Sequence, residues 1–437
     1  MAFSNINAQT VGVQFEKVSK LTPQLYSLSQ LTRARIKKLP AEKVSAWTAG
    51  SGAVLGYRLP IQQYAGGDFA NISLDNGTLP IGSMGQWQNM ALAYNSVGLF
   101  FNLSNLAMMA TGSSEQSSVN VFKNTIDNAW KIFGAAEDAL FYTAGDGILA
   151  NGIGTGAAPS GTNPVYTLEP NFGPQRIYLG QLVDVYNAAG SVVKGTGLYA
   201  AAIDPVAKTV TLTGTVTSPA NDDVIAISGM SATLAAGSSR YGLYNYQSST
   251  TSGSTGGLSR TTVPELVTPS YTANAALSAP MGLLLSDYMI QRRDEKALAN
   301  MTGISHMAQR EAYFVTGDSI SEFQVRDSNI ATSLDRVPRN LTKEAQTFEF
   351  AGVTHLISKF QNRSRIDWVD FDDFVRVNLA DPDYLRTQEG QYIFQNRAST
   401  GAIKTGIFFG IVSTENIGKH DPGRGGILQS LTIPTGM

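Results

Sequence analysis

Residues 117–146 read SSVNVFKNTIDNAWKIFGAAEDALFYTAGD, and this stretch has the period of an amphipathic helix. Ser117 or Ser118 can cap its start, and the glycines at 145 and 147 are typical of its end. About 28 residues at ~1.5 Å each form a rod of roughly 40 Å, which is long for a globular domain. Its one buried stripe, which also includes Glu137, favours a scaffolding role. The predicted core of this helix consists of Phe122, Ile126, Trp130, Phe133 and Leu140.

The segment before the helix contains no lysine or arginine between residues 59 and 122. Two β-capable runs, YRLPIQQY (57–64) and MALAYNSVGLFFNL (90–103), flank a middle with D-N-G and G-G turn signals. They predict a long two-stranded hairpin over 57–104. An isolated hairpin is only marginally stable in water, so this one is expected to lie on another surface.

The first 60 residues are basic, although the whole chain has a net charge of −2. They contain eight lysines and arginines against two glutamates. The candidate contact residues are Arg33, Arg35, Lys37 and Lys38. A basic arm of this kind suits non-specific contact with nucleic acid or an acidic partner surface, and a solvated basic helix is the alternative interpretation.

A Val/Thr/Gly-rich stretch follows the helix, separated from it by a Gly/Pro-rich linker at 151–164. The runs YLGQLVDVYN, KTVTLTGTV and DVIAIS are typical of strands, and turn residues join them. This composition differs from that of both flanks and predicts an inserted small β-barrel or sandwich at 165–240. A Ser/Gly/Thr-rich connection at 247–259 leads back to the main body.

The remaining residues have an α+β pattern. PMGLLLSDYMIQRRDEKALANM (280–301) suggests a strand that runs into a helix beginning near Ser286 or Asp287 and ending at Gly303. Strands are expected in TFEFAGVTHLI, RIDWVDFDDFVRVNL and TGIFFGIV. The interspersed charges of Arg363, Arg365 and Asp367 favour either ion pairs between subunits or a solvated face.

Motifs that carry chemistry are absent from the sequence. It has no cysteine, its three histidines lie far apart, and it contains no H-E-x-x-H, G-x-S-x-G or P-loop motif. The acidic run at 367–373 lacks the glycine and glutamate of a calcium loop and is expected to be a solvated turn. GIGTGA (152–157) follows a helix rather than a strand, so it is no dinucleotide-binding turn. We expect no catalytic, cofactor-binding or metal site, and no membrane span.

The order of these parts resembles that of the major capsid proteins of tailed bacteriophages, of the Hong Kong 97 type. The resemblance covers nearly the whole chain. It rests on the helix that ends EDALFYTAGDGILANG, on RIYLGQLVDVYN as the opening of an inserted β-domain, and on the strand series EFAGVTHLISKFQNRSRIDWVDFDDFVRV.

This resemblance implies an α+β fold with an N-arm, an E-loop, a long spine helix, and peripheral and axial domains, here with an inserted small β-barrel or sandwich. The implied divisions are 1–56 for the N-terminal arm, 57–104 for the E-loop hairpin, 105–164 for the spine helix and the start of the peripheral domain, 165–240 for the inserted β-domain, 241–345 for an axial-domain-like α+β region, and 346–437 for the remaining axial and peripheral strands.

The implied function is assembly of an icosahedral head that encloses double-stranded DNA in the virion, after assembly in the host bacterial cytoplasm. The implied partners are copies of the same chain in hexamers and pentamers, portal, scaffolding and decoration proteins, and DNA held by non-specific contact. Some family members link an E-loop lysine covalently to a neighbour's asparagine. The absence of lysine between 59 and 122 argues against that link here.

Three other readings stay open at the level of sequence. A phage tail or fibre protein shares the Gly/Thr-rich strands but is expected to lack a lone long helix followed by an α+β half. An encapsulin-like compartment shell protein shares the fold. A polysaccharide-acting enzyme needs a pair of carboxylates in a cleft.

Overall fold

The computed structural model describes eleven stretches of the chain. They are residues 36–38, 47–48, 55–66, 84–103, 115–230, 233–235, 237–292, 298–315, 347–385, 394–397 and 403–434.

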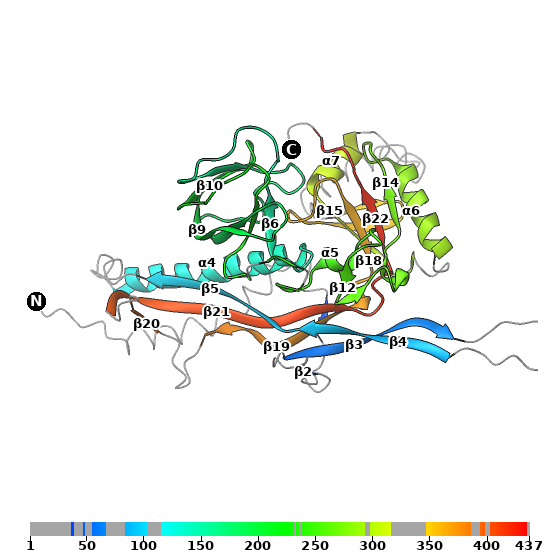
Figure 1. The fold of residues 1–437 in the computed structure, drawn as a ribbon, viewed down its shortest axis with the longest axis horizontal. Helices are drawn as coiled ribbons and strands as arrows, with labels where there is room; N and C mark the ends of the chain where they lie inside the picture. The colour runs from blue at the N-terminus through cyan, green and yellow to red at the C-terminus, as the bar shows by residue number, and fades with distance from the viewer. Residues whose placement is uncertain are drawn as a thin grey trace, which may run out of the picture.

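A long two-stranded ribbon extends from one end of the molecule (Figure 1). Strand β3 (Leu55–Gly66) pairs antiparallel with β4 (Met84–Ala93), and β2 (Trp47–Thr48) adds a short third strand beside the start of β3. Twelve residues at ~3.3 Å each make β3 about 40 Å long. At the base of the ribbon Leu59, Ile61, Met90 and Leu92 are buried. Alternation of these apolar residues with exposed ones is what fixes the base against the core.

The next strand does not belong to this ribbon. β5 (Asn95–Leu103) pairs antiparallel with β21 (Ile403–Lys419), some 300 residues further along the chain. The sequence predicted one hairpin over 57–104, but the paired ribbon ends at Ala93. The residues from 95 onward form part of a different sheet.

That second sheet runs along the length of the molecule. In it β21 pairs with β5, with β19 (Phe374–Tyr384) and with β20 (Phe394–Arg397), and β19 pairs in parallel with the two-residue strand β1 (Lys37–Lys38). We call this the long sheet. Strand β21 is 17 residues long and pairs with every other strand of the long sheet except β1.

Helix α4 (Glu115–Phe141) lies along one face of the long sheet (Figure 1). Ile126, Trp130 and Phe133 pack in one buried cluster with side chains of β19 and β21. On β5, Val97, Leu99 and Phe101 pack against the same cluster, as expected for alternate residues of a strand. The helix begins at Glu115, so the predicted caps at Ser117 and Ser118 are wrong. Those serines lie within the first turn of the helix, which begins two residues before Ser117.

A closed β-barrel follows α4 and lies above it in Figure 1. Its strands are β6 (Ile148–Asn151), β7 (Val165–Thr167), β8 (Leu182–Tyr186), β9 (Val193–Asp204), β10 (Thr209–Thr213) and β11 (Val224–Ile227). They form one antiparallel sheet in the order β6-β11-β8-β9-β10-β7. A bridge between Gly152 and Leu168 joins the two edge strands. The barrel has its own apolar core, which is separate from that of the rest of the chain.

The barrel begins earlier than the sequence predicted. β6 supplies an edge strand from residue 148, whereas the predicted β-domain began at 165. Residues 151–164, predicted as a linker between domains, connect two strands of the same barrel. The Gly/Pro-rich run is therefore a loop inside the domain rather than a boundary. The sequence did not reveal β6, because this strand is short and lacks an alternating pattern.

The α+β unit is built on a six-stranded mixed sheet. Its strands are β14 (Ser270–Thr272), β15 (Thr302–Ser305), β16 (Thr347–Phe350), β17 (Val353–Ile357), β18 (Ile366–Val369) and β22 (Gly426–Gln429), in the order β14-β22-β18-β15-β17-β16. The accompanying helices and short elements are α5 (Leu243–Tyr246), α6 (Ala279–Arg292), α7 (Met307–Val315), η3 (Pro264–Leu266), η5 (Phe371–Asp373), β12 (Ser254–Thr255) and β13 (Leu258–Ser259).

Helix α6 corrects a prediction. The run PMGLLL, predicted as a strand before a helix at 286, is the first half of α6. Pro280 is compatible with the first turn of a helix, and Met281, Leu285 and Met289 are buried at a spacing of four. Gly303, predicted to end this helix, lies in β15. A short apolar run has no period of its own, so strand and helix could not be told apart there.

The acidic run at 367–373, predicted to be a solvated turn, begins inside β18, and its carboxylates at 367 and 370 are buried. Asp367 is fully buried; it pairs with Arg365 at 2.5 Å and accepts a hydrogen bond from Gln361 at 2.6 Å. Asp370 is also buried and pairs with Arg424 at 3.0 Å. The arginine of the first pair lies two residues away and that of the second lies in a loop 54 residues later, so these charges bind within the subunit.

His355 occupies an aromatic box inside this unit. Its ring contacts Phe348 with centroids 4.8 Å apart, and Trp368 Nε1 donates to its Nε2 at 3.0 Å. Burial lowers the pKa of His355 to about 3. Burial also lowers the pKa of His306 to about 4, with a further contribution from Arg363. Both rings are therefore neutral in the folded chain at neutral pH.

Acid is expected to destabilise the subunit through these two rings. The unfolded chain takes up their protons below pH ~6.5, whereas the folded chain does so only at lower pH, so their contribution is complete above 6.5 and decreases as the pH falls. For His355 the slope is roughly 1.4 kcal/mol per pH unit. Urea unfolding at pH 7 and pH 5 should show a smaller loss in His355→Gln, which keeps an acceptor for Trp368. Equal losses in the variant and the parent would contradict this.

Candidate assembly surfaces

The distal part of the ribbon exposes large apolar side chains. On β4, Met84 is 87% exposed and Trp87 is 62% exposed, whereas Met90 and Leu92 nearer the base are buried. Trp87 lies opposite Gln62 in the register of the two strands. A two-stranded ribbon buries little by itself, so these side chains present an apolar surface that another molecule can cover. We call Met84 and Trp87 the ribbon patch.

A second apolar feature lies on the face of the long sheet away from α4. Phe100 on β5 is 52% exposed, and its neighbours Leu99 and Phe101 point toward the helix. The Phe100 ring lies directly over two glycines, Gly98 in its own strand and Gly410 opposite it in β21. A Cβ at Gly410 would lie 2.8 Å from that ring, so only glycine allows the ring to lie flat on the sheet. We call Phe100 and these two glycines the apolar shelf.

The residues of the predicted helix core are placed as follows. Ile126, Trp130 and Phe133 meet in one cluster with Tyr384, and Trp130 Nε1 donates to the Tyr384 hydroxyl at 2.6 Å. Leu140 is buried near the end of α4 but lies outside that cluster. Phe122 lies on α4, outside the residues whose side chains the structure describes.

The structure describes only parts of the predicted basic arm. Lys37 and Lys38 form β1, which pairs in parallel with Val375 and Arg376 of the long sheet. Arg33 and Arg35 lie outside the described residues. The segment that follows these arginines is therefore fixed at an edge of the sheet that carries α4.

A buried ionic cluster under α4 was not predicted, although Glu137 stood out as an acid on the buried stripe. Arg240 contacts Glu137 at 2.6 Å and Glu415 at 3.5 Å, and all three side chains are buried. Arg240 also donates to the backbone oxygen of Ser413 at 2.6 Å and to that of Asn95 at 3.2 Å. One arginine thus joins α4, β5 and β21.

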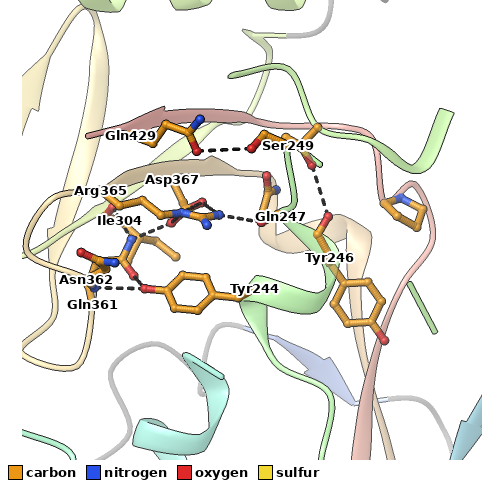
Figure 2. A network of polar contacts seen from close by, with 12 residues as sticks. Tyr244, Tyr246, Gln247, Ser249, Ile304, Gln361, Asn362, Arg365, Asp367 and Gln429 are labelled. Carbon is orange, nitrogen blue, oxygen red and sulfur yellow. Dashed lines mark hydrogen bonds and ion pairs between the residues drawn. The ribbon is translucent and has the colours of Figure 1, made fainter. Parts of the chain in front are cut away.

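A second polar network joins α5 to the α+β sheet (Figure 2). Tyr244 donates to Gln361 at 2.7 Å, and its ring lies 4.5 Å from the Arg365 guanidinium. Arg365 donates to the backbone oxygen of Gln247 at 2.6 Å and pairs with Asp367. Burial raises the pKa of Tyr244 to about 12, so this hydroxyl stays protonated. The arrangement is one of structural hydrogen bonds.

Metal-binding chemistry is not indicated in the part of the chain that the structure describes. No group of three or more His, Asp or Glu side chains there is placed to hold a metal ion. Within the same residues, no helix is long and apolar enough to cross a membrane.

No protein-family model and no curated protein sequence matches the chain. Among solved structures, it is similar to a chain of the cyanophage A-1(L) capsid asymmetric unit, at 10% identity over 92% of this chain and 96% of that one, with a TM-score of 0.48. It is similar to the capsid of the native GTA particle at 10% identity over 93% and 91%, with a TM-score of 0.42. It is also similar to a virus-like particle from Pyrococcus furiosus at 6% identity over 95% and 99%, with a TM-score of 0.38.

Proposed function

We propose that this chain is the major capsid protein of a tailed bacteriophage, of the Hong Kong 97 type. The observation that carries the proposal is the ribbon, about 40 Å long by its strand length, with Met84 and Trp87 exposed far from the core that anchors its base. Such a ribbon is stable only when it lies on a neighbour. The apolar shelf around Phe100 is a suitable surface on that neighbour.

In this proposal each part has a structural role in the shell. α4 is the spine helix, the long sheet belongs to the peripheral domain, and the α+β sheet is the axial domain. The barrel is the inserted domain, and its two connections to the body support this because they lie side by side. Gly237 N and Ser239 N both donate to Gly145 O, at 3.0 and 2.8 Å.

Copies of the chain would form hexamers and pentamers of an icosahedral head. Portal, scaffolding and decoration proteins would complete the particle, which assembles in the host bacterial cytoplasm. Double-stranded DNA would be enclosed without sequence readout, and the basic arm that includes Lys37 and Lys38 would make at most non-specific phosphate contacts.

Electron microscopy of the purified chain tests this function. Closed isometric particles support a shell protein, whereas fibres favour a tail component and monomers favour the enzyme reading. Particles from infected cells that contain double-stranded DNA distinguish a capsid from an encapsulin-like compartment, which would contain protein cargo instead.

Removal of the ribbon patch is expected to prevent assembly without destabilising the subunit. In Met84→Ser/Trp87→Ser, the subunit loses side chains that are exposed, so its unfolding free energy should change by no more than about 0.5 kcal/mol. The assembly threshold should rise about tenfold for each 1.4 kcal/mol of lost contact. Light scattering against concentration measures that threshold.

Val206→Ser is the matched control, because Val206 is 89% exposed on the barrel rather than on the ribbon. It should assemble as the parent does. If the double variant assembles at the parent's threshold, the ribbon is not an intersubunit contact.

A further inference from the structure

The connection between β7 and β8 carries one side chain out of the barrel and into the body of the protein. Arg176 is buried, and its guanidinium donates to Tyr142 O at 2.7 Å and to Phe360 O at 3.1 Å. Tyr142 directly follows the last residue of α4. A cation at this end of a helix satisfies a carbonyl that has no partner within the helix and interacts favourably with the helix dipole.

Aromatic rings hold the same guanidinium. Its carbon lies 3.9 Å from the centroid of Phe172, which belongs to the same connection, and 5.8 Å from that of Tyr244 in α5. Phe172 and Tyr244 are themselves in ring contact at 6.1 Å. The guanidinium therefore stacks on a ring from the barrel side and lies beside a ring from the body.

The body also contacts the connection between β7 and β8 at a second place. Arg363 N donates to Asn171 O at 2.9 Å, and its Nη1 donates to Pro170 O at 3.3 Å. Gln175 contacts His306 Nε2 at 3.2 Å. These contacts place residues 169–177 against two connections of the α+β unit, the one between β17 and β18 and the one between β15 and α7.

Two adjacent crossings of the chain also attach the barrel to the body. Gly145 and Gly237 lie at the entry and the exit, with φ of +85° and +96°, and they are hydrogen-bonded to each other. Two neighbouring connections define an axis about which a domain can turn, since they fix the position of the domain but not its orientation. Residues 169–177 supply a third attachment, which contacts the body at Tyr142, Phe360 and Arg363.

We propose that residues 169–177 form a latch that fixes the orientation of the barrel on the body, with Arg176 as its positioning residue. All contacts of the latch lie within one chain, so this proposal can be tested whether or not the chain forms a shell. When Arg176 is removed, the carbonyls of Tyr142 and Phe360 lose their donor, and the barrel turns about the 145/237 axis while its own core stays intact.

The absence of cysteine allows a direct test, because two introduced cysteines are the only labelling sites. Spin labels at Val206→Cys in the barrel and at Thr262→Cys, an exposed position in the body, report one distance between the two. Labelled chains are diluted with unlabelled chains so that only distances within a subunit are measured. The parent should give a narrow distance distribution, and Arg176→Ala should give a broader or split one.

Lys131→Ala, which removes an exposed cation from α4, serves as the control and should keep the narrow distribution. Hydrogen exchange in Arg176→Ala should become faster at the amides of Gly173, Ile177 and Arg363 but remain slow in β8 to β10. A distribution as narrow as the parent's would overturn the latch. Loss of protection throughout the barrel would also overturn it, because Arg176 would then hold the barrel's own fold.

If Arg176→Ala is insoluble, Phe172→Leu provides a second variant that removes the ring under the guanidinium and leaves the hydrogen bonds. Its distance distribution should be broader than those of the parent and of Lys131→Ala. A distribution equal to the control's would contradict the proposal.

Discussion

Trp130→Asp is expected to abolish soluble subunits and shells. Trp130 is buried between α4 and the long sheet, where it contacts Phe133 and Tyr384 edge to face and hydrogen-bonds to the Tyr384 hydroxyl. The variant loses that packing, which by itself costs about 3–5 kcal/mol, and buries a carboxylate in an apolar cluster at a further cost of several kcal/mol. The sum is comparable to the whole stability of a typical domain.

Two companion variants separate the contributions. Trp130→Phe keeps a ring but loses the bond to Tyr384, so it should fold with a loss of about 1–3 kcal/mol. Lys131→Asp introduces the same acid at the adjacent exposed position and should change the unfolding free energy by no more than about 0.5 kcal/mol. Soluble yield and urea unfolding measure these effects. Normal assembly of Trp130→Asp would show that α4 does not pack through this stripe.

Local periodicity accounts for what could be predicted of the fold. The spacing of Ile126, Trp130 and Phe133 requires a helix with one apolar face, whatever covers that face. Strands β8, β10 and β11 follow from β-branched residues that alternate over short runs. Both signals are contained in fewer than about 20 neighbouring residues, so one sequence is enough to read them.

Partners that are distant in the chain account for what was missed. By sequence, β5 resembles a continuation of the ribbon. In the structure it pairs instead with β21, which lies about 300 residues later in the chain. By sequence Asp370 resembles a solvated acid because charged residues cluster around it, yet it is buried and pairs with Arg424, 54 residues later. Neither outcome depends on the local sequence, since each is decided by which surface the folded chain brings alongside.

The ribbon patch is a different case. Met84 and Trp87 are ordinary strand residues by sequence, and only the extended ribbon leaves them without cover. The one sequence signal for this surface is the absence of lysine and arginine from 59 to 122, which is typical of a segment that contacts another protein surface rather than water.

The ionic cluster at Arg240 leads to the second large effect. Arg240→Met keeps the volume of the side chain but removes the cation that Glu137 contacts at 2.6 Å and Glu415 at 3.5 Å. Breaking a buried ion pair by removing one partner costs about 3–5 kcal/mol, because a buried charge loses its compensation. The unfolding free energy should therefore fall by that amount, and the midpoint of urea unfolding should move to a lower concentration. α4 would keep its apolar packing but lose the arginine that joins it to β5 and β21.

A second substitution tests whether charge, rather than shape, causes this loss. In Arg240→Met/Glu137→Gln the acid on α4 becomes neutral, and its amide can still accept the hydrogen bond from Ser413. The double variant should recover part of the lost stability, since the two side chains contact each other and their effects are not additive. Urea unfolding of the parent, both single variants and the double variant gives the coupling energy directly. If the double variant is less stable than Arg240→Met, the cluster is held by packing and hydrogen bonds, and the buried charge of Glu137 is not what Arg240 compensates.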